Sequence, residues 1–159
     1  ILWFGQHPWF PIMYEILTKI GFKTRMITGI WKKGSGQTMQ PSMYLANDYE
    51  MFFYARKDGG TISKQGRGNI FDFPPVASAK KSHMTERPIE LIEEIFKTFG
   101  WTGCRVMVPF LGSGNSLLAA HNLGMDCFGY ELSPEYKNKY IIRVNDEKQP
   151  FKSYKREEE

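Results

Sequence analysis

The sequence predicts an α/β fold of the Rossmann-like type, in which a mostly parallel sheet carries helices on both faces. The first observation is that helix-like and strand-like segments alternate from residue 85 onward, which is typical of a parallel sheet covered by helices. The second is that the strand-like segments are short apolar runs, as expected for strands buried on both faces. The third is a Gly-Ser-Gly turn that leads from one such strand directly into a helix.

The alternating half contains five expected elements. A helix with Pro88 in its first turn is predicted at 85–99, because apolar residues recur there at helical spacing before Gly100. We further expect a strand at 105–110, a helix at 115–123, a strand at 126–131, and a helix that begins at Pro134 with Ser133 as its cap. The predicted buried face of this last helix consists of Tyr136, Tyr140, Ile141 and Val144.

The first half of the chain is less regular. A strand at 1–4 precedes a helix that begins at Pro11 and ends at Gly21. The remaining predictions are a strand at 24–31, a polar loop at 32–40, a strand at 49–56 and a glycine-rich connection at 58–69. Pro74 and Pro75 exclude a central strand or a helix interior over 70–76.

The composition fits one globular domain, since the chain has 159 residues of which 42% are hydrophobic and 15% aromatic. No apolar run reaches the length of about 18 residues that a membrane span needs. Cys104 and Cys127 stand far apart without a CxxC partner. This favours free, buried thiols and a cytoplasmic location over a disulfide, and it predicts no metal site.

The basic residues gather in the loop-rich middle of the chain, whose net charge is +4. Such a charge hints at a polyanionic partner. Tyr44, Tyr49 and Phe53 lie in the same region, as core residues or as contacts to such a partner. A solvated surface is the ordinary alternative for each basic residue. The candidate contacts to the partner are Lys32, Lys33, Lys64, Arg67, Lys80 and Lys81.

The turn at 112–114 is the main candidate for a binding site, because its glycines let a ligand approach the backbone and the next helix offers free N–H groups. No lysine follows it as a P-loop requires, and Leu117 stands where a dinucleotide fingerprint needs glycine. Glu131 ends the next strand 17 positions after Gly114, where an acid can bind both ribose hydroxyls. A nucleoside ligand is therefore favoured, although an ordinary α/β turn followed by a surface glutamate explains the turn alone equally well.

Four short motifs then follow one another in a fixed order. They are His83-x-Thr85-x-x-Pro88, Pro109-Phe110-x-Gly112-Ser113-Gly114, Gly129-x-Glu131 and Pro134-x-Tyr136. In order and spacing they resemble the permuted, or beta, class of DNA amino-methyltransferases. That family carries His-Pro-Thr-x-Lys-Pro before a strand ending in Asp-Pro-Phe-x-Gly-Ser-Gly-Thr, then Gly-x-Glu and Pro-x-Tyr. The stretch Ile70 to Pro75 is also similar to the sequence that leads into the first of these motifs.

The resemblance implies the Rossmann-like fold of an S-adenosylmethionine-dependent methyltransferase. It also implies methyl transfer from S-adenosyl-L-methionine to an exocyclic amino group of adenine or cytosine in DNA, in a restriction–modification or prophage setting. Thr85 and the turn would hold the methionine end of the cofactor, and Glu131 would bind its ribose. The implied cofactor-binding residues are His83, Thr85, Pro109, Phe110, Gly112, Ser113, Gly114, Asn115 and Glu131.

Some positions depart from the family pattern. Val108 replaces the acid that the family uses near the amino group of the cofactor, which predicts a weaker contact or one supplied elsewhere. Asn115 and Ser116 replace threonines but keep their hydrogen-bonding ability. Met84 and Arg87 replace proline and lysine, and the arginine keeps the positive charge.

The catalytic loop of the family is an acidic or polar residue followed by Pro-Pro and an aromatic residue, and it holds the amine of a flipped base. In the permuted order this loop precedes all the motifs, so we expect it upstream of Ile1 and assign no catalytic residue within the chain. Asp72-Phe73-Pro74-Pro75 is an internal substitute, but it has an extra Phe and lacks the aromatic residue after the prolines.

The expected organisation is one methyltransferase domain over 1–159, with a target-recognition insertion at 32–82, a cofactor-binding half at 83–146 and a tail at 147–159. DNA is the expected partner, no membrane is involved, and either a homo-oligomer or a missing N-terminal segment would complete the protein. Two interpretations of function stay open: an enzyme, and a catalytically incomplete module or subunit that binds cofactor and DNA. An RNA amino-methyltransferase would share the same chemistry.

Overall fold

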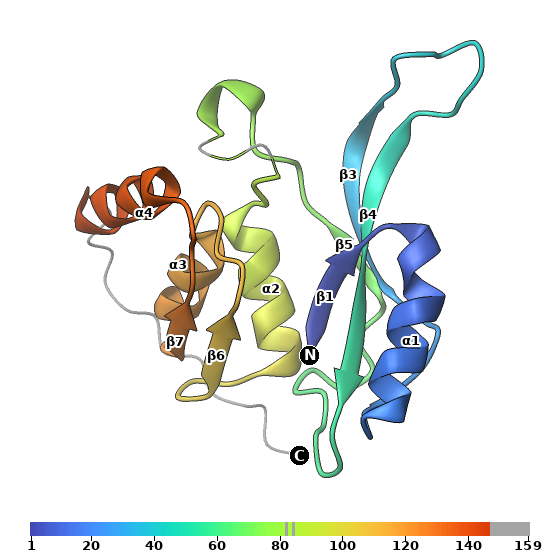
Figure 1. Cartoon of the computed structure of the whole chain (residues 1–159), viewed down its shortest axis with the longest axis vertical. Coiled ribbons are helices and arrows are strands. Elements are labelled where there is room, and N and C mark those ends of the chain that lie inside the picture. Colours follow the sequence, from blue (N-terminus) through green and yellow to red (C-terminus); the bar gives the residue numbers. More distant parts are fainter. Residues whose placement is uncertain (82, 84, 147–159) are drawn as a thin grey trace. The chain divides into compact units, whose positions relative to one another are not determined.

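The computed structural model describes residues 1–81, 83 and 85–146. These residues fall into two compact units (Figure 1). The first unit comprises Ile1–Thr61 and Arg67–Pro74, and the second comprises Ile62–Gly66 and Pro75–Glu159. The chain therefore passes between the units three times, and the motifs of the predicted cofactor-binding half all belong to the second unit.

The first unit is built on a five-stranded sheet in the order β1-β4-β3-β5, with β2 paired to β4. Its strands are β1 (Leu2–Gly5), β2 (Lys23–Thr24), β3 (Gly29–Gln37), β4 (Asn47–Arg56) and β5 (Ile70–Asp72). β4 runs antiparallel to β1, β2 and β3, whereas β5 pairs parallel to β3. The sheet is therefore mixed, which differs from the mostly parallel sheet that was predicted. The reason is the β3–β4 hairpin, because a short connection can join only antiparallel strands.

The β3–β4 ribbon also extends beyond the predicted strand (Figure 1). Residues 32–40 were predicted to be a loop, but β3 continues through Gln37, which pairs with Asn47 after a register shift. Backbone pairing rather than burial holds this polar, glycine-containing part of the strand, so hydrophobic patterning did not reveal it. The predicted strand at 24–31 is instead divided between β2 and β3.

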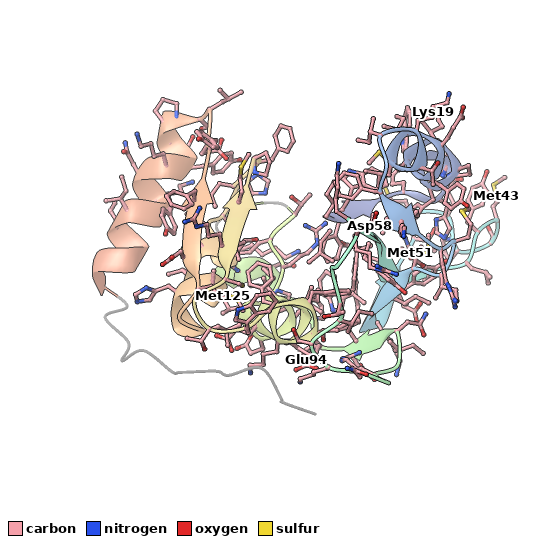
Figure 2. All side chains as sticks on the ribbon, turned by 90° about the horizontal axis from the view of Figure 1, so that it is seen from below. Lys19, Met43, Met51, Asp58, Glu94 and Met125 are labelled. Atoms are coloured by element: carbon pink, nitrogen blue, oxygen red, sulfur yellow. The ribbon has the colours of Figure 1, made fainter. Side chains whose placement is uncertain are left out.

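The core of the first unit lies where α1 (Phe10–Lys19) packs on the sheet. Phe10 and Leu17 come from the helix, and Phe53 and Ala55 come from β4; all four are buried. A 3-10 turn at His7–Trp9 leads into the helix, whose limits agree with the prediction to within two residues. The surrounding half-buried side chains are Trp3, Met13, Tyr14, Phe22 and Met51, the last labelled in Figure 2.

The second unit contains a parallel pair of strands, β6 (Arg105–Val108) and β7 (Asp126–Gly129). Its helices are α2 (Ile89–Phe99), α3 (Asn115–Asn122) and α4 (Pro134–Asp146), preceded by a 3-10 turn at Ser78–Lys80. The predicted alternation of helix, strand, helix, strand and helix is thus confirmed. A core cluster of Ala120, Leu123 and Met125 holds α3 and β7 together, with half-buried partners Phe96, Cys104, Val106 and Cys127; Figure 2 labels Met125.

The limits of several elements in this unit differ from the prediction. α2 begins at Ile89 rather than Thr85, because a residue that precedes proline, here Arg87, is disfavoured in the helical conformation. β6 ends at Val108 rather than Phe110, because Pro109 has no N–H to donate to a ladder. In α4, Ile141 was predicted to be buried but is 45% exposed. The side chain of Val144 lies outside the described part of the chain.

Cys104 and Cys127 are free thiols, as predicted, but they are half-buried rather than buried. Within residues 1–81, 83 and 85–146, none of the helices combines the length and the apolar character that crossing a membrane requires.

Candidate functional site

A cavity of about 670 Å³ opens in the second unit where β6 and β7 end. This volume suits a cofactor-sized ligand. Eight of the nine residues predicted to bind the cofactor line it: His83, Thr85, Pro109, Phe110, Gly112, Ser113, Asn115 and Glu131. A second hollow, of about 530 Å³, lies in the β3–β4 hairpin, but its lining includes no charged residue. The first cavity is therefore the better candidate.

The glycine turn shapes one wall of this cavity. Gly112 and Gly114 have φ values of +58° and +81°, which only glycine adopts without strain. The N–H of Leu111 donates to the carbonyl of Tyr130, so the turn is joined to the chain that leaves β7. The bend directs the N-terminus of α3, which begins at Asn115, toward the cavity, where the positive end of the helix dipole favours a negatively charged group.

The Glu131 carboxylate lies against this turn. One of its oxygens accepts a hydrogen bond from the Gly112 N–H at 2.7 Å, and the other accepts from the Ser133 N–H at 2.8 Å. These two donors, Ser133 more than Gly112, hold the pKa of Glu131 below its ordinary value of 4.5. Each carboxylate oxygen keeps a further lone pair for a hydroxyl donor. The ionised acid is thus positioned to accept from the hydroxyls of a sugar.

His83 and Thr85 line the cavity next to this turn. The Thr85 N–H donates to Nδ1 of His83 at 3.2 Å. The Thr85 hydroxyl lies 3.1 Å from the same nitrogen. The other face of the imidazole approaches Gly112, because a Cβ there would lie 3.8 Å from Nε2. The histidine therefore connects its own segment to the glycine turn.

Two tyrosines of α4 pack around the same turn. The Tyr136 ring lies 4.5 Å from the imidazole of His83, measured between ring centroids. The Tyr140 ring occupies the space that a Cβ at Gly114 would need. The predicted cap is also present, since the Ser133 hydroxyl accepts from the Tyr136 N–H at 3.4 Å. Gly114 does not itself line the cavity but lets α4 approach the turn.

Several lining residues were not predicted. Tyr130 had no assigned role in the sequence, yet its side chain is 65% exposed at the cavity, next to Phe110 at 90% and Leu132 at 99%. Large apolar side chains with such exposure mark a surface that a ligand can cover. Their position directly after the two strands was the available signal. The other unpredicted lining residues are Arg87, Ile92, Leu111 and Ser116.

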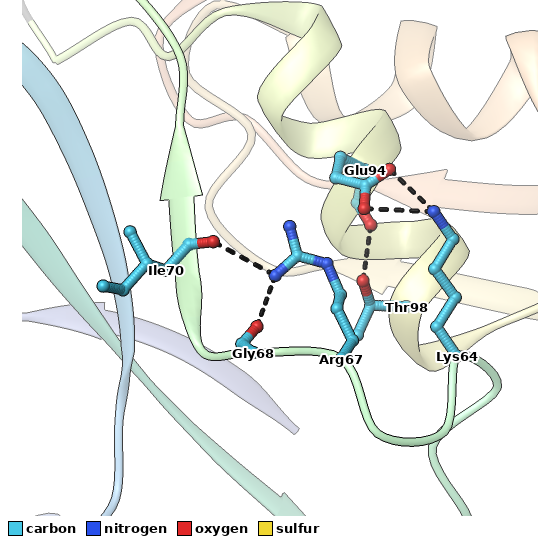
Figure 3. Close-up of polar contacts among 6 residues, drawn as sticks. All are labelled: Lys64, Arg67, Gly68, Ile70, Glu94 and Thr98. Atoms are coloured by element: carbon cyan, nitrogen blue, oxygen red, sulfur yellow. Dashed lines mark hydrogen bonds and ion pairs between the residues drawn. The ribbon is translucent and has the colours of Figure 1, made fainter.

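The basic residues predicted to contact DNA differ in what surrounds them. Lys33 and Lys64 are partly buried and form ion pairs with Glu50 and Glu94, respectively, both at 2.9 Å. Figure 3 shows the Lys64 pair, in which the ammonium group contacts both oxygens of the carboxylate. Lys32 is more exposed and pairs with Asp72 at 2.8 Å. These three lysines each have a carboxylate partner, which competes with a phosphate for them.

The remaining basic candidates are Arg67, Lys80 and Lys81. Arg67 donates to the carbonyls of Gly68 and Ile70 (Figure 3), and its guanidinium stacks on the Phe71 ring at 3.6 Å. Lys81 is exposed. The side chain of Lys80 lies outside the described part of the chain.

The aromatic candidates of the middle region differ in how far they are buried. Phe53 is fully buried and belongs to the core, whereas Tyr44 is 62% exposed. Tyr49 is half-buried, and its hydroxyl lies 2.7 Å from Nε2 of His7.

The internal substitute for a catalytic loop, Asp72 to Pro75, is tied into the sheet. Asp72 ends β5 and pairs with Lys32. The Phe73 N–H donates to the carbonyl of Lys32, and the Phe73 carbonyl accepts from the indole of Trp31. The stretch therefore serves as the edge of a sheet, and the Asp72 carboxylate is already engaged. Among the described residues, no three His, Cys, Asp or Glu side chains are grouped as metal ligands.

Comparisons with known proteins agree with this geometry. The family model described as DNA methylase matches residues 3–143. The Type II methyltransferase M.MthZI of Methanothermobacter thermautotrophicus is 24% identical over 151 residues, which cover 74% of this chain but only 42% of that protein. The chain thus spans less than half the length of this relative.

Solved structures show the same fold. The crystal structure of the M1.HpyAVI–SAM complex has a TM-score of 0.80 at 22% identity, covering 91% of this chain and 73% of the other. The cytosine-N4-specific PvuII DNA methyltransferase has a TM-score of 0.71 at 15% identity, covering 89% of this chain and 58% of the other. These similarities are consistent with the predicted Rossmann-like fold. Because the family model spans most of the chain and the glycine turn and Glu131 lie within its match, the chain belongs to the DNA methylase family.

Proposed function

We propose that the cavity of the second unit binds S-adenosyl-L-methionine, and that the protein of which this chain is a part methylates an exocyclic amino group of adenine or cytosine in DNA. The observation that carries this proposal is the meeting of the Glu131 carboxylate and the glycine turn, 2.7 Å apart, at the mouth of one cavity. Family membership and the SAM complex of M1.HpyAVI support the same ligand.

The residues of the cavity fit each part of that cofactor. Glu131 would accept hydrogen bonds from the ribose hydroxyls, because the donors that keep it ionised leave further lone pairs. The exposed Phe110 and Leu132 offer an apolar surface for the adenine ring. The positive end of α3 and the guanidinium of Arg87 would hold the carboxylate of the methionine end. When bound, the cofactor supplies an electrophilic methyl group on a sulfonium.

The contribution of these residues to methyl transfer is orientation. A rigid turn, fixed by Gly112, Glu131 and Tyr130, holds the cofactor in one pose and so lowers the entropy loss on reaching an aligned geometry. The described residues include no loop that we assign to the incoming amine. We propose that an acidic or polar residue before Pro-Pro-aromatic in the whole protein holds it, as in the permuted family arrangement, where such a loop precedes the cofactor motifs.

DNA is the proposed substrate because the family acts on it, and a cytoplasmic location and a restriction–modification setting belong to the same proposal. M.MthZI carries the name of a Type II methyltransferase, which supports that setting. The positive net charge and the exposed Lys81 support binding to a polyanion. A catalytically incomplete cofactor- and DNA-binding subunit is the second candidate, favoured by the absence of an acid at Val108.

Calorimetry with S-adenosylhomocysteine and S-adenosylmethionine tests the cofactor site. We expect both to bind the folded chain, and Glu131→Ala to weaken both by at least about tenfold, because hydrogen bonds to a charged acceptor are lost. Glu135→Ala is the matched control, since Glu135 is exposed in the first turn of α4 and pairs locally with Lys139 in the contacts described. Absence of binding to folded wild-type chain would overturn the assignment.

Activity is measured separately, on the whole protein. DNA incubated with S-adenosylmethionine is digested to nucleosides, and N6-methyldeoxyadenosine and N4-methyldeoxycytidine are quantified by mass spectrometry. One of the two products is expected from an enzyme. Cofactor binding without either product, on DNA that contains all short sequence contexts, would instead identify the incomplete subunit.

A further inference from the structure

Glu86 is a buried acid beside the cavity that neither the motifs nor the proposed binding residues include. Its side chain is only 5% exposed, whereas an acid is seldom buried unless the structure uses the charge. It lies in the segment between the 3-10 turn and α2, and its N–H donates to the carbonyl of His83 at 3.1 Å. A buried carboxylate in this position lies directly behind the cavity wall.

Both oxygens of Glu86 contact residues of that wall. Oε1 accepts from the amide of Asn115 at 3.1 Å, and Oε2 accepts from the N–H of His83 at 3.3 Å. The Asn115 amide also donates to the Arg87 carbonyl at 2.6 Å, and Asn115 is itself only 2% exposed. His83, Arg87 and Asn115 all line the cavity. Hydrogen-bond donors on both oxygens match the ionised form of the acid.

We propose that Glu86 is a positioning residue whose fixed negative charge makes the cavity prefer the sulfonium form of the cofactor over its neutral thioether product. This inference rests on the proposed function. S-adenosylmethionine carries one positive charge more than S-adenosylhomocysteine, and the two are otherwise nearly identical in shape. A charge held a short distance behind the wall acts through poorly screening protein rather than through water, so it distinguishes the two ligands without touching either.

The other charged residues at the cavity act differently on this pair of ligands. Arg87 is positive and would face the carboxylate of the methionine end, which both ligands share. Glu131 is negative and contacts the turn at the proposed ribose site. The Asn115 amide, which donates to Glu86, is uncharged. Two variants therefore separate an electrostatic effect from a purely structural one. The first removes the charge of Glu86, and the second removes the hydrogen bond from the Asn115 amide to Glu86.

The test is the ratio of the two dissociation constants, Kd for S-adenosylhomocysteine over Kd for S-adenosylmethionine, measured by calorimetry on folded chain. Glu86→Gln keeps the size of the side chain and removes its charge, and we expect the ratio to fall by roughly 3- to 10-fold. Asn115→Ser keeps the charge of Glu86, so both ligands should weaken by a similar factor at an unchanged ratio. Glu90→Gln, at an exposed acid in the first turn of α2, should change neither constant.

A second measurement covers the case in which Glu86→Gln does not fold. Sinefungin is an analogue of the cofactor in which a carbon bearing an ammonium group replaces the methylated sulfonium, so it keeps the positive charge. Wild-type chain is expected to bind it more tightly than S-adenosylhomocysteine. An unchanged ratio in Glu86→Gln, or weaker binding of sinefungin than of S-adenosylhomocysteine, overturns the inference while leaving the proposed cofactor site intact. Failure of all three ligands to bind overturns the proposed function instead.

Discussion

At Gly114, backbone conformation and packing both require a residue without a side chain. Its φ of +81° lies in the left-handed region, and the Tyr140 ring of α4 fills the space of a Cβ. Gly103 has a similar φ of +84° but meets nothing within 4 Å. Comparing the two glycines separates the cost of the backbone angle from the cost of the steric overlap.

We expect Gly114→Ala to lower the free energy of unfolding by more than Gly103→Ala does. The angle alone costs about 1–2 kcal/mol in either variant, and at Gly114 the displacement of α4 adds to it. Thermal and urea unfolding measure the difference. Adding Tyr140→Ala to Gly114→Ala should recover part of the loss. Equal destabilisation by the two glycine variants would contradict the proposed role of Tyr140.

The lowered pKa of Glu131 predicts how ligand affinity changes at acidic pH. Because the folded state lowers this pKa below 4.5, the carboxylate contributes stability at any pH above its ordinary value and loses it as the pH falls through the lower, folded value. The affinity for S-adenosylhomocysteine should therefore persist through the ordinary titration range of a glutamate and fall only in stronger acid. Calorimetry across that range tests this, and Glu131→Gln should remove this part of the pH dependence. Loss of affinity already at the ordinary value would show that the backbone donors do not hold the charge.

At the scale of elements, Trp31 joins β3 to the segment after β5. Its side chain is 2% exposed, and its indole N–H donates to the Phe73 carbonyl at 2.8 Å. The Phe73 N–H in turn donates to the carbonyl of Lys32, so both backbone polar groups of Phe73 are bonded to β3. A buried indole with a satisfied donor combines packing and hydrogen bonding at one position.

Trp31→Phe is expected to destabilise the first unit by about 1–3 kcal/mol, because the Phe73 carbonyl loses its donor and the smaller ring leaves space. Denaturant unfolding followed by circular dichroism provides the measurement. Trp9→Phe is the control, since Trp9 is 56% exposed and the same change there should be nearly neutral. Similar losses for both variants would argue against the buried contact as the cause.

At the scale of the whole molecule, the two units have different strand directions. The first unit is mostly antiparallel through β4, and the second holds the parallel pair β6–β7 with the cavity at its carboxyl end. Ligand sites of α/β proteins lie at the carboxyl ends of parallel strands. The positive charge, by contrast, is spread over both units, and much of it is paired with acids.

This pairing predicts which lysine matters for DNA. Lys81 is exposed, so Lys81→Ala should lower the slope of log affinity against log salt by about one. Lys33 is paired with Glu50 and partly buried, so Lys33→Ala should change the slope by much less. Fluorescence anisotropy with a duplex at several salt concentrations measures both. A larger change from Lys33 than from Lys81 would contradict the assignment.

The sequence by itself determined the order of the elements in the second unit and the glycine turn. These follow from local rules, since glycine angles, helix caps and apolar periodicity act over a few neighbouring residues. The eight predicted residues that line the cavity came instead from the resemblance of the motifs to a known family. Only the tertiary structure decided the direction of β4, the length of β3, the ion pairs of Lys33 and Lys64, and the position of Glu86 behind the wall. Those depend on contacts between residues far apart in the chain, which no local pattern records.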